Sequence, residues 1–202
     1  MIQPGKIAVI FILLALMPKT AISATIMVFG DSLSAGYGVP TGKSWVDLLQ
    51  QKLGKTRYRV VNASISGETT SGGLARINPA LEKFRPEIVI LELGANDGLQ
   101  GEPLYITKKN LESMVAACKR RKARILLVGM RLPPNYGRKY SDEFMAIYPD
   151  IARSRKLAFV PFMLRGFAGN LGDFQADGLH PSEEAQSKVL SNIWKGLEPM
   201  LR

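Results

Sequence analysis

The sequence predicts an α/β fold, a parallel sheet covered by helices on both faces, built as a single domain. Runs of β-branched and aliphatic residues, none longer than six, alternate with segments whose apolar residues recur at helical spacing. Such short apolar runs are typical of parallel strands that are buried on both faces. A chain of 202 residues with 46% hydrophobic residues can build one core, and no repeat or Pro/Gly-rich linker divides it.

Five runs are expected to form the strands, with helical patterns between or after them. The strands are residues 26–29, 59–61, 88–93, 125–128 and 157–160. Helical spacing of apolar residues occurs in residues 45–53, 111–118, 144–151 and 189–197. Because ligands of an open parallel sheet bind beyond the carboxyl ends of its strands, the segments that follow these runs are the first place to look for chemistry.

Residues 1–24 have the form of a signal peptide. A lysine gives a positive start, residues 7–17 form an apolar run, and small residues precede position 25. The run is shorter than the ~20 residues of a membrane-spanning helix. We therefore expect export, cleavage after Ser23 or Ala24, a mature domain of residues 25–202 and no stable membrane anchor. An uncleaved N-terminal anchor is the alternative.

The charge and the cysteine content narrow the range of partners. The formal net charge is +10, and losing Lys6 and Lys19 with the leader would leave +8. The densest basic cluster, Lys119–Lys122, falls at the end of a helical pattern, where it complements the helix dipole, so we expect no nucleic-acid partner. Cys118 is the only cysteine and is expected to be buried, which excludes an intramolecular disulfide.

Polar and glycine-rich segments stand where the predicted strands end. The first three strands are followed by residues 30–34, 62–67 and 94–98, and the fourth by residues 131–137. A fifth such segment, residues 177–182, precedes the last helical pattern, which Pro181 is expected to open. The carboxyl ends of parallel strands meet at one edge of the sheet, so these segments are expected to form one site.

Three residues in these segments suit nucleophilic catalysis. A serine hydroxyl needs a base within hydrogen-bond reach and a group that orients the base. His180 is the only histidine of the chain, and Asp177 stands three residues before it in a glycine-containing turn. Ser32 follows the first strand. These residues predict a catalytic triad with Ser32 as nucleophile, His180 as general base and Asp177 as the residue that orients the base.

An acyl-transfer site also needs donors for the oxyanion. The candidates are the Ser32 N–H, the Gly67 N–H, where no side chain blocks approach, and the Asn96 side-chain amide. Taken singly, each has an ordinary alternative as a turn residue or an Asx turn. Their common position after strands favours an oxyanion hole.

Other sites are excluded by missing residues. The Gly-x-Ser-x-Gly elbow of α/β-hydrolases is absent because Ser34 stands at its fifth position. The glycines after the first strand are not followed by the Gly-Lys-Ser/Thr of a phosphate loop. With one histidine and one cysteine, a catalytic zinc site is not expected, and the following aspartates lack metal-ligand spacing: Asp31, Asp47, Asp97 and Asp173.

The motifs resemble those of the GDSL, or SGNH, hydrolases. Four blocks match in order and spacing over nearly the whole mature region: Gly30-Asp31-Ser32-Leu33, Gly67, Gly94-x-Asn96-Asp97 and Asp177-x-x-His180. The chain is most similar to the periplasmic thioesterase, lysophospholipase and arylesterase branch, through residues 62–67, 92–94, 131–133, 135–137 and 146–149. Ala95 departs from this pattern, since some close relatives have glycine there.

The resemblance implies the fold, the roles and the substrates in more detail. It implies a three-layer α/β/α, flavodoxin-like sheet of five parallel strands, the triad and oxyanion hole given above, and no metal or organic cofactor. By the same resemblance Leu99 would line the acyl pocket. The residues themselves indicate two further roles: Pro133, which is apolar and near the expected mouth of the site, would contact the acyl chain, and Asp31 would hold the nucleophile turn by accepting backbone N–H bonds rather than take part in chemistry. The expected substrates are small acyl esters and thioesters, including lysophospholipids, and the expected location is the periplasm, with secretion as the alternative.

Two other functions remain open. A carbohydrate O-deacetylase uses the same residues, but the apolar residues near the expected mouth of the site favour an acyl chain. A non-catalytic binding protein with this fold is the second alternative, and the complete set of serine, glycine, asparagine and histidine argues against it.

Overall fold

The computed structural model describes residues 24–54 and 57–201 and contains a five-stranded parallel sheet. Its strands are β1 (Ala24–Gly30), β2 (Tyr58–Asn62), β3 (Ile88–Glu92), β4 (Arg124–Val128) and β5 (Ala158–Val160). The strand order β2-β1-β3-β4-β5 is the flavodoxin-like order. The predicted three-layer α/β/α architecture is therefore confirmed. Each predicted run overlaps one strand, and two of them, 88–93 and 157–160, extend one residue beyond it.

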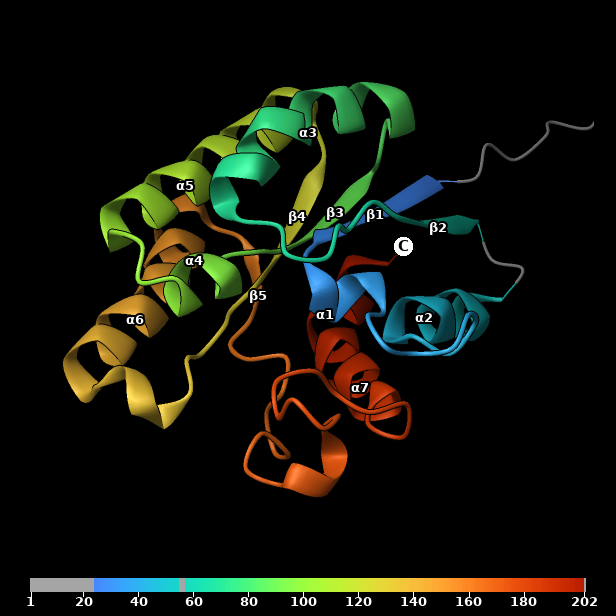
Figure 1. Ribbon diagram of the computed structural model, residues 1–202. Helices are drawn as coiled ribbons and strands as arrows, with labels where there is room; N and C mark the ends of the chain where they lie inside the picture. The colour runs from blue at the N-terminus through green and yellow to red at the C-terminus, as the bar shows by residue number, and fades with distance from the viewer. Residues whose placement is uncertain (1–23, 55–56, 202) are drawn as a thin grey trace, which may run out of the picture.

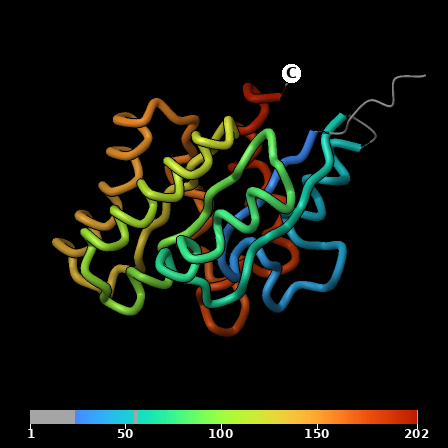
Figure 2. Tube along the Cα trace, turned by 90° about the horizontal axis from the view of Figure 1, so that it is seen from above, coloured from blue at the N-terminus to red at the C-terminus, as the bar shows by residue number. Residues whose placement is uncertain are grey.

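Helices cover both faces of the sheet (Figures 1 and 2). One face carries α2 (Trp45–Leu53) and α7 (Gln186–Leu197), and the other carries α3 (Thr70–Phe84), α5 (Leu104–Arg120) and α6 (Arg138–Arg155), which lie side by side in Figure 2. Short elements connect the layers: α1 (Ser32–Ala35), α4 (Ala95–Leu99), η1 (Pro134–Tyr136), η2 (Leu171–Asp173) and η3 (Glu198–Met200).

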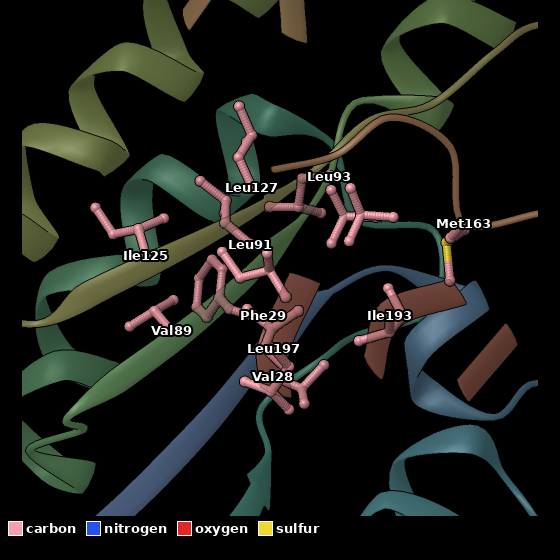
Figure 3. Packing of buried hydrophobic residues seen from close by; sticks show 14 of the residues in the cluster. Val28, Phe29, Val89, Leu91, Leu93, Ile125, Leu127, Met163, Ile193 and Leu197 are labelled. Carbon is pink, nitrogen blue, oxygen red and sulfur yellow. The ribbon is translucent and has the colours of Figure 1, made fainter. Parts of the chain in front are cut away.

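The inner strands β1, β3 and β4 form the centre of the core because nearly all of their residues are buried. Every residue of β3 is buried, and Figure 3 shows Phe29, Val89 and Leu91 packed together. On the other face, Ile193 and Leu197 of α7 close the core. Burial of each such side chain contributes about 1.5–3 kcal/mol.

Cys118 is fully buried on α5. Burial raises the pKa of its thiol to about 12, so the thiolate is not populated near neutral pH. The expectation of a structural, unreactive cysteine agrees with this position.

Helix α3 has no counterpart among the predicted helical segments. Two adjacent glycines and Pro79 interrupt its apolar pattern. The Thr69 side chain caps its start, and Ile77 and Leu81 face the core. A Cβ at Gly73 would lie 2.5 Å from the Leu93 side chain, so this glycine allows α3 to approach the sheet closely.

Pro181 does not open the last helix, contrary to the expectation. It pairs with Phe174 in an isolated antiparallel bridge, and the Ser182 N–H donates to the Asp173 carbonyl over 2.8 Å. These bonds hold the chain extended, and α7 begins only at Gln186. The segment after His180 is thereby bonded to residues 173–174.

The predicted leader lies outside the described residues, apart from Ala24, which begins β1 and pairs with Tyr58. Within residues 24–54 and 57–201, no helix combines the length and the apolar character needed to span a bilayer.

Candidate active site

The carboxyl ends of the first three strands meet at one edge of the sheet, as predicted. The sheet register places Gly30 of β1 opposite Glu92 of β3. The Ile65 N–H donates to the Gly30 carbonyl over 3.0 Å, and the Asn62 side-chain amide donates to the Ser34 carbonyl over 2.8 Å. These bonds fix the segment after β2 against the turn after β1.

Ser32, His180 and Asp177 form one hydrogen-bonded row. The Ser32 Oγ lies 2.8 Å from His180 Nε2, and His180 Nδ1 lies 2.7 Å from the Asp177 carboxylate. A carboxylate only accepts, so Nδ1 carries the proton and Nε2 accepts from the serine hydroxyl. The structure therefore brings together three side chains whose sequence positions span 148 residues from Ser32 to His180.

The turn around Asp177 organises this row. Asp177 Oδ1 accepts the N–H groups of Leu179 and His180 over 2.8 and 3.0 Å, and Gly178 has a φ of +68°. Burial by itself would raise the pKa of Asp177, but these N–H bonds and the His180 ring outweigh it and lower the pKa to about 2. Asp177 is thus a fixed negative charge throughout the neutral range.

Ser32 is the first residue of the short helix α1. The Asp31 carboxylate caps this helix by accepting the Leu33 N–H over 3.0 Å. The second Asp31 oxygen lies 3.4 Å from the Asn96 amide nitrogen. Asp31 therefore joins the turn that carries Ser32 to the segment that carries Asn96, in agreement with a structural contribution to this turn.

Asn96 and the Gly67 segment are also joined directly. The Asn96 amide donates to the Glu68 carbonyl over 2.9 Å. Gly67 has a φ of +78°, which favours glycine, and a Cβ there would meet open space. The three expected oxyanion donors thus belong to segments that hydrogen bonds hold together.

Arg76 supports this junction, although no sequence pattern indicated such a role. From α3, its guanidinium pairs with the Glu68 carboxylate and donates to the Ala63 carbonyl over 2.6 Å. It also lies over the Phe29 ring at 3.9 Å. Arg76 therefore holds the segment that contains Gly67 against the end of β1.

Glu92 is a second supporting residue, and the sequence motifs did not indicate a role for it. Its side chain is fully buried, accepts the Ser34 hydroxyl over 2.6 Å and lies 3.4 Å from the Asp31 N–H. Burial, and then the charge of Asp31, raise the pKa of Glu92 well above its usual value, although both donors oppose this. Its position as the one acidic residue in an otherwise apolar run, residues 88–93, could have indicated this role.

Gly30→Ala is expected to destabilise the protein by about 1–3 kcal/mol. A Cβ at Gly30 would lie 2.5 Å from the Glu92 carboxyl and 2.8 Å from its backbone carbonyl, which cannot swing away. Urea unfolding measures the loss of stability. Gly42→Ala serves as a control without a steric clash, because a Cβ at Gly42 would meet open space, although the φ of Gly42 is positive. An unfolding midpoint at or above that of the wild type would contradict this packing.

The Asp31 carboxyl is buried and titrates unusually high. Burial raises its pKa from 3.8 to about 7, the Leu33 N–H opposes the rise, and the charges of Asp97 and Glu68 add to it. Between pH 3.8 and about pH 7, the Asp31 carboxyl of the folded protein keeps a proton that it has released in the unfolded chain. The contribution of Asp31 to stability is therefore complete below pH 3.8 and is lost as the pH rises through 7.

Asp31→Asn is accordingly expected to flatten the pH dependence of stability. From pH 5 to pH 8 the wild type should lose about 3 kcal/mol of unfolding free energy more than the variant, whose amide does not titrate. Urea titrations at several pH values measure both curves. Identical slopes for wild type and variant would show that Asp31 does not titrate in this window.

Leu99 and Pro133 come from segments that lie together. The Tyr136 hydroxyl donates to the Leu99 carbonyl over 3.1 Å, which ties α4 to η1. Pro133 directly precedes η1, and both Leu99 and Pro133 are half-buried. In the part of the chain that is described, no three or more His, Cys, Asp and Glu side chains gather in a way that could hold a metal ion.

A parallel α/β/α sheet with a Ser–His–Asp row at its strand ends has the layout of a serine-dependent hydrolase. The chain belongs to the GDSL-like Lipase/Acylhydrolase family, whose model matches residues 28–188. It is 45% identical over 190 residues to Esterase TesA of Pseudomonas aeruginosa, covering 93% of this chain and 94% of the relative.

Two further comparisons agree. The chain is 38% identical over 192 residues to the Escherichia coli protein named Thioesterase 1/protease 1/lysophospholipase L1, with 95% of this chain and 92% of the relative covered. The crystal structure of TesA superimposes with a TM-score of 0.84 at 47% identity, covering 88% of this chain and 99% of that one.

Proposed function

We propose that the protein hydrolyses carboxylic esters and thioesters through an acyl-enzyme on Ser32. The observation that carries the proposal is the row of 2.8 and 2.7 Å contacts from Ser32 through His180 to Asp177. His180 Nε2 accepts the hydroxyl proton as Ser32 Oγ attacks the acyl carbon, and the ionised Asp177 stabilises the imidazolium. His180 then gives the proton to the departing alcohol or thiol.

Deacylation repeats these steps with water. His180 takes a proton from a water molecule, whose oxygen attacks the acyl carbon, and the bond to Ser32 Oγ breaks as the proton returns to it. In both halves the oxyanion is stabilised by the N–H groups of Ser32 and Gly67 and by the Asn96 amide. The segments of these donors are held by Arg76 and by the Asn96–Glu68 bond.

We propose acyl esters, thioesters and lysophospholipids as the substrate classes. Support comes from the names of the two relatives, an esterase and a thioesterase that is also named a lysophospholipase. Leu99 and Pro133, on segments that Tyr136 ties together, would contact the acyl chain. This mechanism requires no metal or organic cofactor.

Hydrolysis of 4-nitrophenyl esters with acyl chains of two to sixteen carbons tests the proposal. The expected result is turnover that peaks beyond acetate and disappears in Ser32→Ala. Ser113→Ala, on the exposed face of α5, serves as the control and should retain full activity. Activity on acetate alone would favour a carbohydrate O-deacetylase, and no activity on any ester would favour a binding protein.

We also propose that residues 1–24 direct export to the periplasm. Ala24 donates its N–H to the Arg57 carbonyl over 2.7 Å and is the first residue of β1. Cleavage after Ser23 would therefore leave the strand complete, whereas cleavage after Ala24 would shorten it. The N-terminal sequence of the mature protein, isolated from a periplasmic fraction, distinguishes the two cleavage sites and tests the export itself.

A further inference from the structure

Two exposed apolar or aromatic side chains, Tyr37 and Leu179, lie close in the chain to the proposed nucleophile and its base. In the described part of the chain, the large apolar or aromatic side chains that are exposed are Tyr37, Ile65, Tyr105, Leu171 and Leu179. Tyr37 follows α1, which begins with Ser32, and Leu179 directly precedes His180. Exposed apolar groups beside reactive side chains mark a surface that a ligand can cover.

Tyr37 lies against the proposed general base. Its ring centroid is 4.6 Å from that of His180, with 41° between the ring planes. Tyr37 is nevertheless 53% exposed. Contact with His180 therefore leaves much of the ring open to a second planar group.

Gln175 holds Tyr37 in this place. The Gln175 side-chain amide donates to the carbonyls of Tyr37 and Pro181 over 2.8 and 3.2 Å, and its backbone N–H donates to the His180 carbonyl over 2.8 Å. One side chain thus fastens the loop that carries Tyr37 to the turn that carries His180. The aromatic surface is fixed before a substrate arrives, which lowers the entropic cost of binding.

The chemistry of the site decides which part of a substrate meets Tyr37. In the tetrahedral intermediate, the former carbonyl carbon carries Ser32 Oγ, the oxyanion, the acyl chain and the leaving group. The oxyanion faces the segments of Gly67 and Asn96, and the leaving atom must lie beside His180 Nε2 to receive its proton. Side chains that flank the His180 ring are therefore nearest to the leaving group.

We propose that Tyr37, which lies against His180, forms a leaving-group subsite that takes aromatic or other planar alcohols and thiols. The inference rests on the proposed acyl-enzyme mechanism and adds a specificity for the group that departs. The Tyr37 ring contacts the planar leaving group during acylation, when the bond from Ser32 Oγ to the acyl carbon forms. The carbon–leaving-group bond then breaks, and His180 protonates the leaving atom. Deacylation is unaffected because the leaving group has already gone.

The test compares two esters of one acid, phenyl butyrate and 2,2,2-trifluoroethyl butyrate. Both give the same butyryl-enzyme and both have activated leaving groups, but only one leaving group is aromatic. Tyr37→Ala should lower kcat/KM for the phenyl ester by about 3- to 10-fold relative to wild type, and change that for the trifluoroethyl ester less than about 2-fold. Tyr37→Phe keeps the ring and should match the wild type on both esters.

Two controls separate this role from simple support of His180. Tyr105→Ala removes an even more exposed tyrosine, on α5, and should change the hydrolysis of neither ester. Tyr37→Leu, which keeps an apolar side chain against His180, should repeat the selective loss even if Tyr37→Ala folds poorly. Equal losses on both esters in Tyr37→Ala and in Tyr37→Leu would overturn the subsite and leave Tyr37 as a support for His180. Full hydrolysis by Ser32→Ala would instead refute the proposed mechanism itself.

Discussion

Ser32→Ala is expected to lower the turnover of a 4-nitrophenyl butyrate ester by about 10⁴-fold or more. The variant lacks the hydroxyl oxygen that lies 2.8 Å from His180 Nε2, so no acyl-enzyme can form on residue 32. Little structural change should follow because the hydroxyl is small and only half-buried. Initial rates, with circular dichroism to verify folding, measure the effect against Ser113→Ala.

The same experiment tests whether Ser32 and His180 act as one unit. His180→Ala should lose nearly as much activity as Ser32→Ala, and the double variant should be no worse than either single one. Additive losses in the double variant would mean that the two side chains act in separate steps. That outcome is incompatible with proton transfer along the observed row.

Asn96→Ala is expected to lower kcat by about 100- to 1,000-fold, with a much smaller change in KM. An oxyanion donor strengthens its bond as charge develops in the transition state, so its removal affects turnover more than substrate binding. The bond from the Asn96 amide to the Glu68 carbonyl, 2.9 Å long, holds the side chain in place, and the longer contact with Asp31, 3.4 Å, is the one that the oxyanion would replace. Steady-state kinetics on the same ester measure both constants.

Asn192→Ala provides a matched control for this variant. Asn192 is also an asparagine whose amide donates to two backbone carbonyls, those of Met163 and Arg165, but it lies on α7. We expect Asn192→Ala to lose stability and to keep its turnover. A folded Asn96→Ala variant with undiminished kcat would remove Asn96 from the oxyanion hole.

The strands and the triad candidates could be predicted from the sequence because each depends on residues that are close together in the chain. Short β-branched runs correspond to the five strands because parallel strands buried on both faces need continuous apolar residues. The triad candidates could be chosen from the sequence because the chain has a single histidine and Asp177 stands in the same turn. Helix α3 was missed because its packing depends on Gly73, a residue that weakens a helix taken by itself.

Residues that act through tertiary contacts could not be predicted in this way. Arg76 is separated from Ala63 and Glu68 by 13 and 8 positions, and no spacing rule links them. Gln175 joins the loop of Tyr37 across 138 positions. Pro181 was misjudged for the same reason, since a bridge to Phe174 holds it extended where its local preference would start a helix.

If Ser32 is the nucleophile, a covalent inhibitor that reacts with activated serines must modify it. The wild-type protein is treated with a 4-nitrophenyl alkylphosphonate, digested and analysed by mass spectrometry. We expect one phosphonyl group per protein molecule, located on Ser32, with complete loss of esterase activity and no labelling of Ser32→Ala. Loss of activity accompanied by a label on any other residue, with Ser32 unmodified, would contradict the assignment of Ser32 as the nucleophile.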